Sequence, residues 1–333
     1  MSYRPTPALL AFSDVAFGAK TVASEVVDAA FGMPSGKLRQ RAGIVSLSYA
    51  EAGETEVTLA IRAASGALTR SGAGAEAVDW ILAVSETHQA FPSLAAQLHR
   101  AIGARQSCGA MDIGGACLGF LHALAVAEAL LESGHARTVL VATGDVHSRT
   151  LTPGRVAGEF GGLFGDGASA FLVESGNSRA PSAFALQDFF FGCAVQYQQA
   201  IQVRGEPNDR LRVIFDGDAL SRAATARLDE CVRELEQRSG VRRNQVAAFA
   251  THQPNPRLVA LVARKIGVPP ERFPLVADLH GNLGPTTCAA ALHYALERVA
   301  RDEAKEPQPI FLASLGPGLL FGGGWLRPPT ARK

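Results

Sequence analysis

The feature that most constrains this chain is the run from Ile113 to Ala127, which contains no charged side chain. A helix that is apolar all round is buried, either in a protein core or in a membrane. The run is about 15 residues long, against roughly 20 for a membrane span, and it contains His122. We therefore interpret it as a buried core helix and expect no membrane-spanning segment.

Cys117 lies at the start of this helix, behind Gly114 and Gly115. Small residues let other backbone approach closely, and a helix N-terminus carries partial positive charge and free N–H groups. These lower the pKa of a thiol and can donate to an oxyanion. Cys117 is therefore a candidate nucleophile, although a small buried hydrophobe explains this segment alone equally well.

Composition narrows the choice of partners. The 333 residues include 32 basic and 31 acidic side chains, a net charge of +1, so no overall field attracts nucleic acid or an anionic membrane. The five cysteines are widely spaced and show no metal-ligand spacing, which fits a reducing cytoplasm. The start "MSYRPTPALLAFSDVAFG" lacks the pattern of an export signal. We expect a cytoplasmic protein that binds small molecules or proteins and holds no metal.

Alternating strand-like and helix-like segments predict an α/β fold. In the first half, the apolar strand Trp80–Val84 follows the helical stretch Glu56–Arg70. The second half repeats the theme with a strand at Val246–Thr251 and helices at Pro256–Ile266 and Pro285–Arg301. Each half also closes on a similar phrase, "FGDGASAFLV" and "FGGGWLRP", which hints at internal duplication.

The pattern loosens from about Ser175 to Asp218, where we expect a long excursion. Three consecutive aromatic residues, Phe189, Phe190 and Phe191, lie within it. They could line an acyl pocket, but an aromatic run of this kind is more often ordinary core, and we favour core.

Two polar residues lie at the ends of predicted elements in the second half. His252 follows the strand Val246–Thr251, and Asn282 lies in a glycine-rich loop before a helix. Each alone is more simply explained as a structural residue. Because ligands of α/β folds bind beyond the carboxyl ends of strands, we expect Cys117, His252 and Asn282 to converge on one crevice. A thiol, an imidazole and an amide donor suit thioester chemistry.

Over nearly its whole length the chain resembles the β-ketoacyl-acyl-carrier-protein synthase III family, the initiating ketosynthases of the thiolase superfamily. Six phrases in family order carry the resemblance: "HQAFPS", "DIGGACLGF", "GDVHSR", "FGDGA", "HQPNPR" and "HGN". It implies a thiolase-like α/β fold of two pseudo-symmetric βαβαβ-type halves in an α/β/α/β/α arrangement. Residues 1–176 form the half with the nucleophile, and residues 177–333 form the half with the histidine and asparagine.

The resemblance also implies the role of each site residue. Cys117 is the acylated nucleophile, while His252 and Asn282 promote malonyl decarboxylation and hold the resulting enolate. The substrates are thioesters of coenzyme A or of phosphopantetheine, and no metal or redox cofactor takes part. Phe91 falls where the family inserts a phenylalanine into its partner's pocket, so the implied assembly is a homodimer.

Carrier-protein docking in the family uses a basic strip beside the entrance. The matching positions here are Arg222, Arg257, Arg264 and Lys265, although a solvated helix face also explains them. Arg41 and Arg149 match the residues that meet the nucleotide of coenzyme A. The family's tryptophan that stacks on the adenine is replaced by Lys37, which weakens coenzyme A as the donor and makes a carrier-bound donor more plausible.

The C-terminal glycine loop also departs from the family pattern. Its triple glycine donates an N–H to the oxyanion, and this chain has Gly316, Pro317 and Gly318. Proline has no N–H, so the oxyanion hole keeps only the Cys117 amide unless Gly318 moves into range. Loss of one donor typically costs about 10² to 10³ in rate. The chalcone-synthase branch also has Gly-Pro-Gly, so the change is compatible with a working site.

Glu86 lies close in sequence to Phe91 and could therefore be near the site. Some members of the superfamily place a glutamate there as a base, whereas a surface carboxylate is the simpler interpretation.

The leading hypothesis is a decarboxylating Claisen condensation, in which Cys117 takes an acyl group from a thioester and a malonyl thioester supplies the attacking enolate. One alternative is a related acyltransferase that passes the acyl group to a hydroxyl or amine, with His252 as base. A second is an inactive subunit that only completes a neighbour's dimer site.

Overall fold

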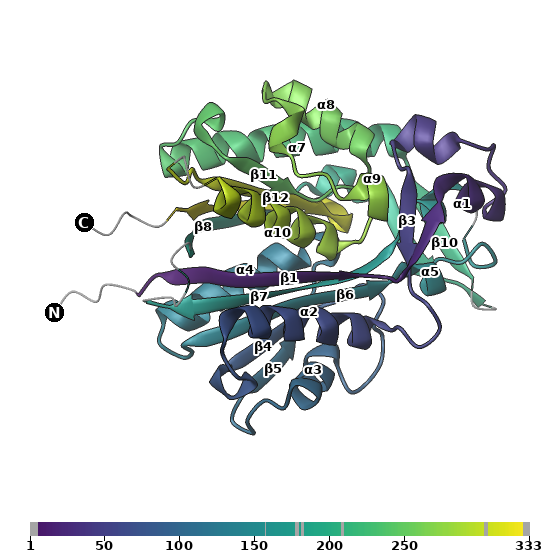
Figure 1. The fold of residues 1–333 in the computed structure, drawn as a ribbon. Coiled ribbons are helices and arrows are strands. Elements are labelled where there is room, and N and C mark those ends of the chain that lie inside the picture. Colours follow the sequence, from purple (N-terminus) through teal and green to yellow (C-terminus); the bar gives the residue numbers. More distant parts are fainter. Residues whose placement is uncertain are drawn as a thin grey trace.

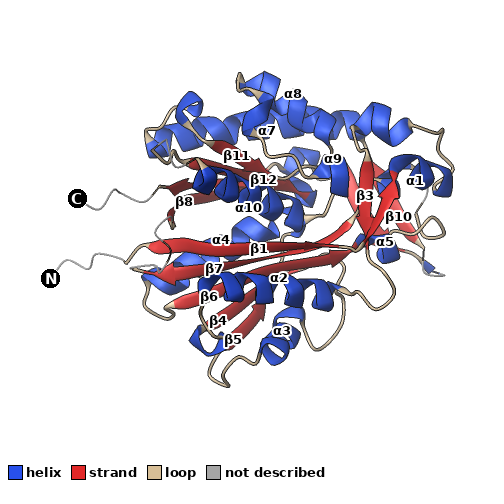
Figure 2. Cartoon of the chain, in the orientation of Figure 1, coloured by secondary structure: helices blue, strands red, loops and turns tan. Residues whose placement is uncertain are grey.

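The computed structural model describes residues 6–156, 158–176, 180, 183–207, 210–302 and 306–328. Strands and helices alternate along it (Figures 1 and 2). The strands are β1 (Ala8–Phe17), β2 (Lys20–Ala23), β3 (Ser46–Tyr49), β4 (Trp80–Val84), β5 (Gly109–Asp112), β6 (Thr138–Val146), β7 (Asp166–Ser175), β8 (Phe184–Cys193), β9 (Ile201–Gly205), β10 (Leu211–Phe215), β11 (Ala248–Thr251), β12 (Ile310–Gly316) and β13 (Leu320–Arg327). The helices are α1 (Ser24–Ala30), α2 (Glu56–Ser71), α3 (Leu94–Ile102), α4 (Gly119–Glu132), α5 (His147–Thr150), α6 (Glu159–Gly162), α7 (Gly217–Ser239), α8 (Pro256–Ile266), α9 (Ala277–His280) and α10 (Pro285–Arg301).

The main sheet has the strand order β11-β12-β13-β8-β1-β7-β6-β4-β5. Its two parts repeat one pairing pattern. In the first, β1 pairs antiparallel with β7, β7 antiparallel with β6, and β6 parallel with β4. In the second, β8 pairs antiparallel with β13, β13 antiparallel with β12, and β12 parallel with β11. This repetition confirms the internal duplication predicted from the sequence.

The elements stack in five layers. Helices α2 and α3 cover the outer face of the first part, and α7 and α8 cover the outer face of the second (Figure 1). Helices α4 and α10 lie between the two parts and contact strands of both. The parts meet at their edges, where Leu9 and Leu10 of β1 pair with Ala185 and Phe184 of β8. The thiolase-like α/β/α/β/α arrangement is confirmed.

Burial explains why the first part of α4, up to Ala127, carries no charge. Phe120, Leu121 and Leu124 are fully buried and belong to the core cluster that also contains residues of α10. Because α4 touches strands on both sides, a charged side chain on these positions would have no access to water. Within the described residues, no helix combines the length and the apolar character needed to cross a bilayer.

The segment between about Ser175 and Asp218, where we expect a long excursion, is mostly regular structure. The segment contains the ten-residue strand β8 and the hairpin of β9 and β10. Phe189 and Phe190 on β8 pack against buried clusters, but Phe191 is 42% exposed. The interpretation of the three phenylalanines as core therefore fails at Phe191, which shares a face of β8 with Phe189 but lies closer to the end of the strand, beside His122.

Candidate active site

Four polar side chains follow the carboxyl ends of strands that meet at one side of the sheet, and two more belong to neighbouring segments. Glu86 lies two residues after β4, Cys117 lies in the turn after β5, and His147 directly follows β6. In the second half, His252 directly follows β11. Because β4, β5 and β6 are mutually parallel, and β11 is parallel to β12, their carboxyl ends open on shared edges. The remaining two, Asn282 and Asp145, belong to the loop before α10 and the end of β6.

Cys117 lies on a short 3₁₀ turn, Ala116–Leu118, that leads into α4. The turn begins with positive φ angles, +124° at Gly115 and +48° at Ala116, and a Cβ at Gly115 would lie 2.4 Å from His122 Nδ1. Position 115 therefore tolerates only glycine. The hydroxyl of Ser314 on β12 donates a 2.8 Å hydrogen bond to the Cys117 carbonyl, so the second half of the chain fixes the position of this residue.

The thiol is buried, with Cys117 only 9% exposed. Burial raises the pKa of the Cys117 thiol well above its ordinary value, and the negative charges of Glu86 and Asp145 add to the increase. The expectation that the helix N-terminus lowers this pKa is therefore wrong for the resting site. Desolvation and two nearby carboxyl groups outweigh the helix dipole, so the sulfur rests as a thiol and needs a proton acceptor when it reacts.

His252 is 7% exposed, and its backbone N–H donates to the Ala313 carbonyl at 3.2 Å. Burial lowers the pKa of His252 to about 4, although the Glu86 charge opposes the shift. The imidazole is therefore neutral at neutral pH. Its Nδ1 atom is buried and has no hydrogen-bond partner among the described residues, which leaves it available to a substrate.

Asn282 is held by contacts on every side except its amide nitrogen. Its Oδ1 atom accepts hydrogen bonds from the Gly284 N–H at 2.9 Å and from the Thr287 hydroxyl at 3.3 Å. Its backbone N–H donates to the Leu163 carbonyl, and its backbone carbonyl accepts from the Gly165 N–H. Because the side-chain oxygen Oδ1 already accepts two hydrogen bonds, the amide has one orientation, and its NH₂ group remains as a donor.

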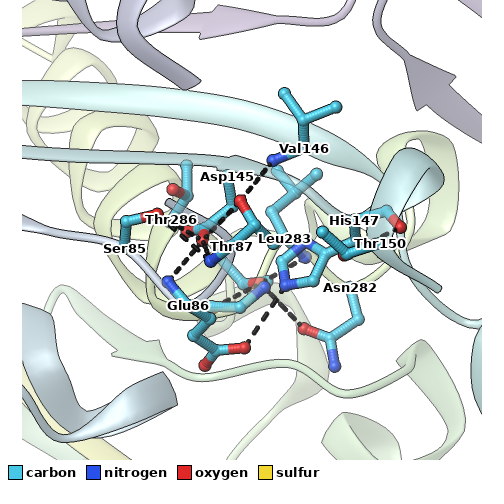
Figure 3. A network of polar contacts seen from close by, with 12 residues as sticks. Ser85, Glu86, Thr87, Asp145, Val146, His147, Thr150, Asn282, Leu283 and Thr286 are labelled. Atoms are coloured by element: carbon cyan, nitrogen blue, oxygen red, sulfur yellow. Dashed lines mark hydrogen bonds and ion pairs between the residues drawn. The ribbon is translucent and has the colours of Figure 1, made fainter. Parts of the chain in front are cut away.

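The structure adds a buried polar network that sequence reasoning missed (Figure 3). Oδ1 of Asp145 accepts hydrogen bonds from the backbone N–H groups of Glu86, at 2.6 Å, and of Thr87, at 3.1 Å. This carboxylate fixes the loop after β4 and therefore the position of Glu86. Burial raises the pKa of Asp145 to about 7, while the positive charge of His147 opposes the increase. The phrase "GDVHSR" contains both Asp145 and His147. A histidine directly after a predicted strand was the one sequence signal that could have indicated this network.

Glu86 is not a surface carboxylate, contrary to the simpler interpretation from the sequence. Its Oε2 atom lies 3.3 Å from His147 Nε2, and the two side chains are 19% and 3% exposed. Burial lowers the pKa of His147, but the hydrogen bond to Glu86 and the charges of Asp145, Glu86 and Asp166 raise it to about 9 overall. Burial raises the pKa of Glu86, and the hydrogen bond and charge of His147 more than reverse this, leaving it lowered. The two form a buried ion pair.

The three candidate residues for binding the nucleotide of coenzyme A differ in whether their side chains already contact other residues. Lys37 pairs with Glu159 at 3.0 Å. Arg149 donates to the backbone carbonyls of Glu51 and Glu54, and so holds the loop between β3 and α2. Arg41 is exposed.

The four predicted docking residues are exposed cations on two packed helices of the second half. Arg222 lies on α7, and Arg257, Arg264 and Lys265 lie on α8. None forms an ion pair with another described residue. Phe91 lies in the loop before α3 and is 98% exposed.

The glycine loop packs on the cysteine turn. A Cβ at Gly316 would lie 3.0 Å from the Gly115 carbonyl and 3.4 Å from the Leu118 nitrogen. Pro317 begins a short turn, and Gly318 has a φ of +96°. Within the described residues, no group of three histidine, cysteine, aspartate or glutamate side chains is arranged to hold a metal ion.

Two parts of one sheet that repeat one topology, with a cysteine turn between them, define the thiolase-like class of α/β transferases. Family models agree: that of 3-oxoacyl-[acyl-carrier-protein] synthase III matches residues 111–188, and that of its C-terminal part matches residues 236–327. The chain belongs to the β-ketoacyl-acyl-carrier-protein synthase III family.

Relatives and solved structures support this placement. The chain is 31% identical over 298 residues to the β-ketoacyl-acyl-carrier-protein synthase III of Granulibacter bethesdensis, covering 87% of this chain and 89% of that protein. It is 33% identical over 291 residues to the Bordetella petrii protein of the same name, covering 85% of each. The FabH structure of Pseudomonas aeruginosa matches with a TM-score of 0.84 at 24% identity, over 98% of this chain and 100% of that one. A Xanthomonas campestris OleA variant matches with a TM-score of 0.85 at 19% identity, over 98% and 99% of the two chains.

Proposed function

We propose that this enzyme catalyses a decarboxylating Claisen condensation between an acyl group on Cys117 and a malonyl thioester. The thiol of Cys117 attacks the acyl thioester and releases the carrier thiol. Loss of carbon dioxide from the malonyl group then gives an enolate, which attacks the acyl carbon and frees the sulfur. The product is a β-ketoacyl thioester.

The observation that carries this proposal is the orientation of Asn282. Its carbonyl oxygen is occupied by Gly284 and Thr287, so the NH₂ group is the part that can donate to an enolate oxygen. His252 supports the same role, because its low pKa, about 4, keeps the imidazole neutral and able to donate one hydrogen bond. Two fixed donors in a site shielded from water stabilise developing negative charge effectively.

The test measures the two half-reactions separately. Purified protein is mixed with an acyl thioester and malonyl carrier protein, and released carbon dioxide and product mass are recorded. Asn282→Ala is expected to reduce condensation by about 10² to 10³ while acylation of Cys117 continues, because only the enolate step loses a donor. If the wild-type protein is acylated but yields neither carbon dioxide nor a β-ketoacyl product, the proposal is wrong.

A second candidate function is acyl transfer from Cys117 to a hydroxyl or amine. The Glu86 carboxylate favours it, because this buried anion lies beside Cys117 and His252. A malonyl carboxylate entering the site meets a like charge, whereas a neutral acceptor does not. Product mass separates the two reactions, since acyl transfer consumes no malonyl group and releases no carbon dioxide.

We further propose that the acyl groups arrive on acyl carrier protein, with coenzyme A thioesters as alternative donors. The exposed cations of α7 and α8 suit an acidic carrier although the net charge is only +1. Lys37 is engaged in a salt bridge, and Arg149 donates to backbone carbonyls. Among the three candidate residues for the nucleotide, Arg41 is therefore the one without such a contact to another described residue. This arrangement favours a carrier-bound donor.

The same reasoning supports a cytoplasmic homodimer. Strand β5 is at the edge of the main sheet, and an unpaired edge is a template for pairing with a second copy. Phe91 is 98% exposed and Met111 on β5 is 37% exposed, which is the character of interface residues seen without their partner. All five cysteines are free, as expected in a reducing compartment.

A further inference from the structure

A carboxylate oxygen in the site remains without a partner. Oε1 of Glu86 is buried and makes no well-aligned hydrogen bond with a described residue, while Oε2 faces His147 at 3.3 Å. The Cys117 thiol is a weak donor beside this carboxyl group. Leaving a buried acceptor unsatisfied costs free energy, so an atom in this state points to a function performed when the site is occupied. The Cys117 thiol lies near enough to this carboxyl group for each to perturb the pKa of the other.

The geometry of His147 keeps Glu86 ionised. Nδ1 of His147 lies 3.1 Å from the Gly165 carbonyl oxygen, and Nε2 lies 3.3 Å from Glu86 Oε2. Both neighbours accept hydrogen bonds, and a neutral imidazole has only one N–H. The arrangement therefore requires the imidazolium form, and its charge is balanced by the carboxylate.

Gly284 lies against this pair, and a residue with a Cβ there would crowd it. A Cβ at Gly284 would lie 3.1 Å from His147 Cε1 and 3.2 Å from Glu86 Oε2. The Glu86 backbone is held by Asp145 at 2.6 Å. The carboxylate is therefore fixed by contacts on two sides, and its unpartnered oxygen is the free one.

Besides Glu86, whose pKa is lowered, the candidate acceptor of the thiol proton is His252. Its pKa is lowered to about 4 by burial, whereas the pKa of Cys117 is raised well above its ordinary value. Proton affinity therefore does not separate the two acceptors, but position does, because Glu86 is a hydrogen-bonding neighbour of the thiol. The Glu86 carboxylate is already paired with the His147 imidazolium. When Glu86 takes the thiol proton, this imidazolium balances the charge of the Cys117 thiolate.

We propose that Glu86 is the proton acceptor of the Cys117 thiol during acyl loading and that His147 is its positioning residue. As the sulfur attacks the thioester carbonyl, the thiol proton moves to a Glu86 oxygen. When the bond to the carrier sulfur breaks, the same proton passes to the leaving thiolate, and Glu86 returns to the carboxylate. The inference rests on the proposed function only in requiring that Cys117 is acylated.

The experiment compares two reactions of the same sulfur in the full-length enzyme. Single-turnover loading from an acyl thioester is followed by intact mass, and alkylation by iodoacetamide is followed at pH 9. For Glu86→Gln we expect loading at pH 7 to fall about 100-fold or more, because general-base assistance is lost. Alkylation is expected to be as fast as in the wild type or faster, because removing the Glu86 charge makes the thiolate easier to form.

Glu86→Asp keeps a carboxylate and is expected to load at least about tenfold faster than Glu86→Gln. Glu271→Gln, an exposed glutamate on a turn, is the matched control and should behave as the wild type. Loading by Glu86→Gln at the wild-type rate overturns the proposal. Equal loss of loading and alkylation also overturns it, because the residue is then structural.

His147→Gln tests the positioning role through the pH profile of loading. Without the imidazolium, the pKa of Glu86 rises, because an opposite charge within hydrogen-bonding distance normally lowers a carboxyl pKa by about 1 to 3 units. The pH at which loading falls to half is therefore expected to move upward by about one unit or more. The groups that face this pair are Cys117, Asp145, Asp166 and His252. An unchanged profile contradicts the role of His147.

These results are separable from failure of the proposed function. If the wild type is never acylated, the function fails. If it is acylated with the same rate and pH profile in all variants, only the assignment of Glu86 and His147 fails.

Discussion

At the scale of single residues, the surroundings of each side chain determine its chemistry. His147 and His252 are both buried, at 2% and 7% exposure. The first has a carboxylate at 3.3 Å and is cationic, while the second has an unpartnered Nδ1 among the described residues and is neutral. The same residue type therefore supplies a fixed charge at one position and a neutral donor at the other.

The charge of His147 makes the stability of the protein depend on pH. Its folded-state pKa is about 9, above the ordinary value of about 6.5. The stabilisation is therefore complete below about pH 6.5 and is lost as the pH rises through 9. We expect His147→Gln to lack this loss, so that its free energy of unfolding in urea falls less between these pH values than that of the wild type. Parallel pH curves for the two proteins contradict the ion pair.

At the scale of elements, the ends of strands and the starts of helices hold the site together. The carbonyl of Cys117 is held by Ser314 at the end of β12, and Gly316 packs against the same turn. Gly284 precedes α10 with φ +58° and ψ −134°, a conformation that is strained for residues with a Cβ. These contacts join the two halves of the chain at the site.

The substitution Gly284→Ala tests the packing at this point of contact between the two halves. The substitution adds both backbone strain and a contact with Glu86 and His147 at about 3.2 Å. Gly267→Ala is the matched control, because its φ is +70° and no atom lies within 4 Å of the added Cβ. We expect Gly284→Ala to lower the free energy of unfolding by at least about 1 kcal/mol more than the control does. Equal losses in denaturant titrations contradict the packing described here.

At the scale of the whole molecule, periodic patterns in the sequence predicted the architecture well. The bounds of α8 and α10 agree with the predicted helices, because proline at the first turn and clear periodicity mark them. The duplication agrees with the two repeated phrases, and the five layers agree with what the family resemblance implied.

The sequence could not predict the charge state of the site. Glu86 and His147 are 61 residues apart, and no local pattern indicates that they meet. The pKa of Cys117 was predicted in the wrong direction, because the helix N-terminus is visible in the sequence while desolvation and the charge of Glu86 are not. The strand β8 was missed because its pairing with β13 is long-range.

The surface charge of α8 gives a prediction at this same scale. Arg264→Glu is expected to weaken binding of an acidic carrier protein by about tenfold at low salt, with a smaller effect at high salt. The exposed Arg100 on α3 provides the control Arg100→Glu, which makes the same change of net charge on the other half. Equal weakening by both variants, measured as carrier affinity, contradicts a docking surface on α8.

The central claim is that the sulfur of Cys117 carries the acyl group. The most direct measurement is the intact mass of the wild type and of Cys117→Ala after incubation with acyl thioesters of coenzyme A and of carrier protein. The account predicts that the wild type gains one acyl mass, mapped by peptide analysis to Cys117, and that the variant gains none. An adduct that persists in Cys117→Ala, or a wild-type protein that stays unmodified with every donor, contradicts it.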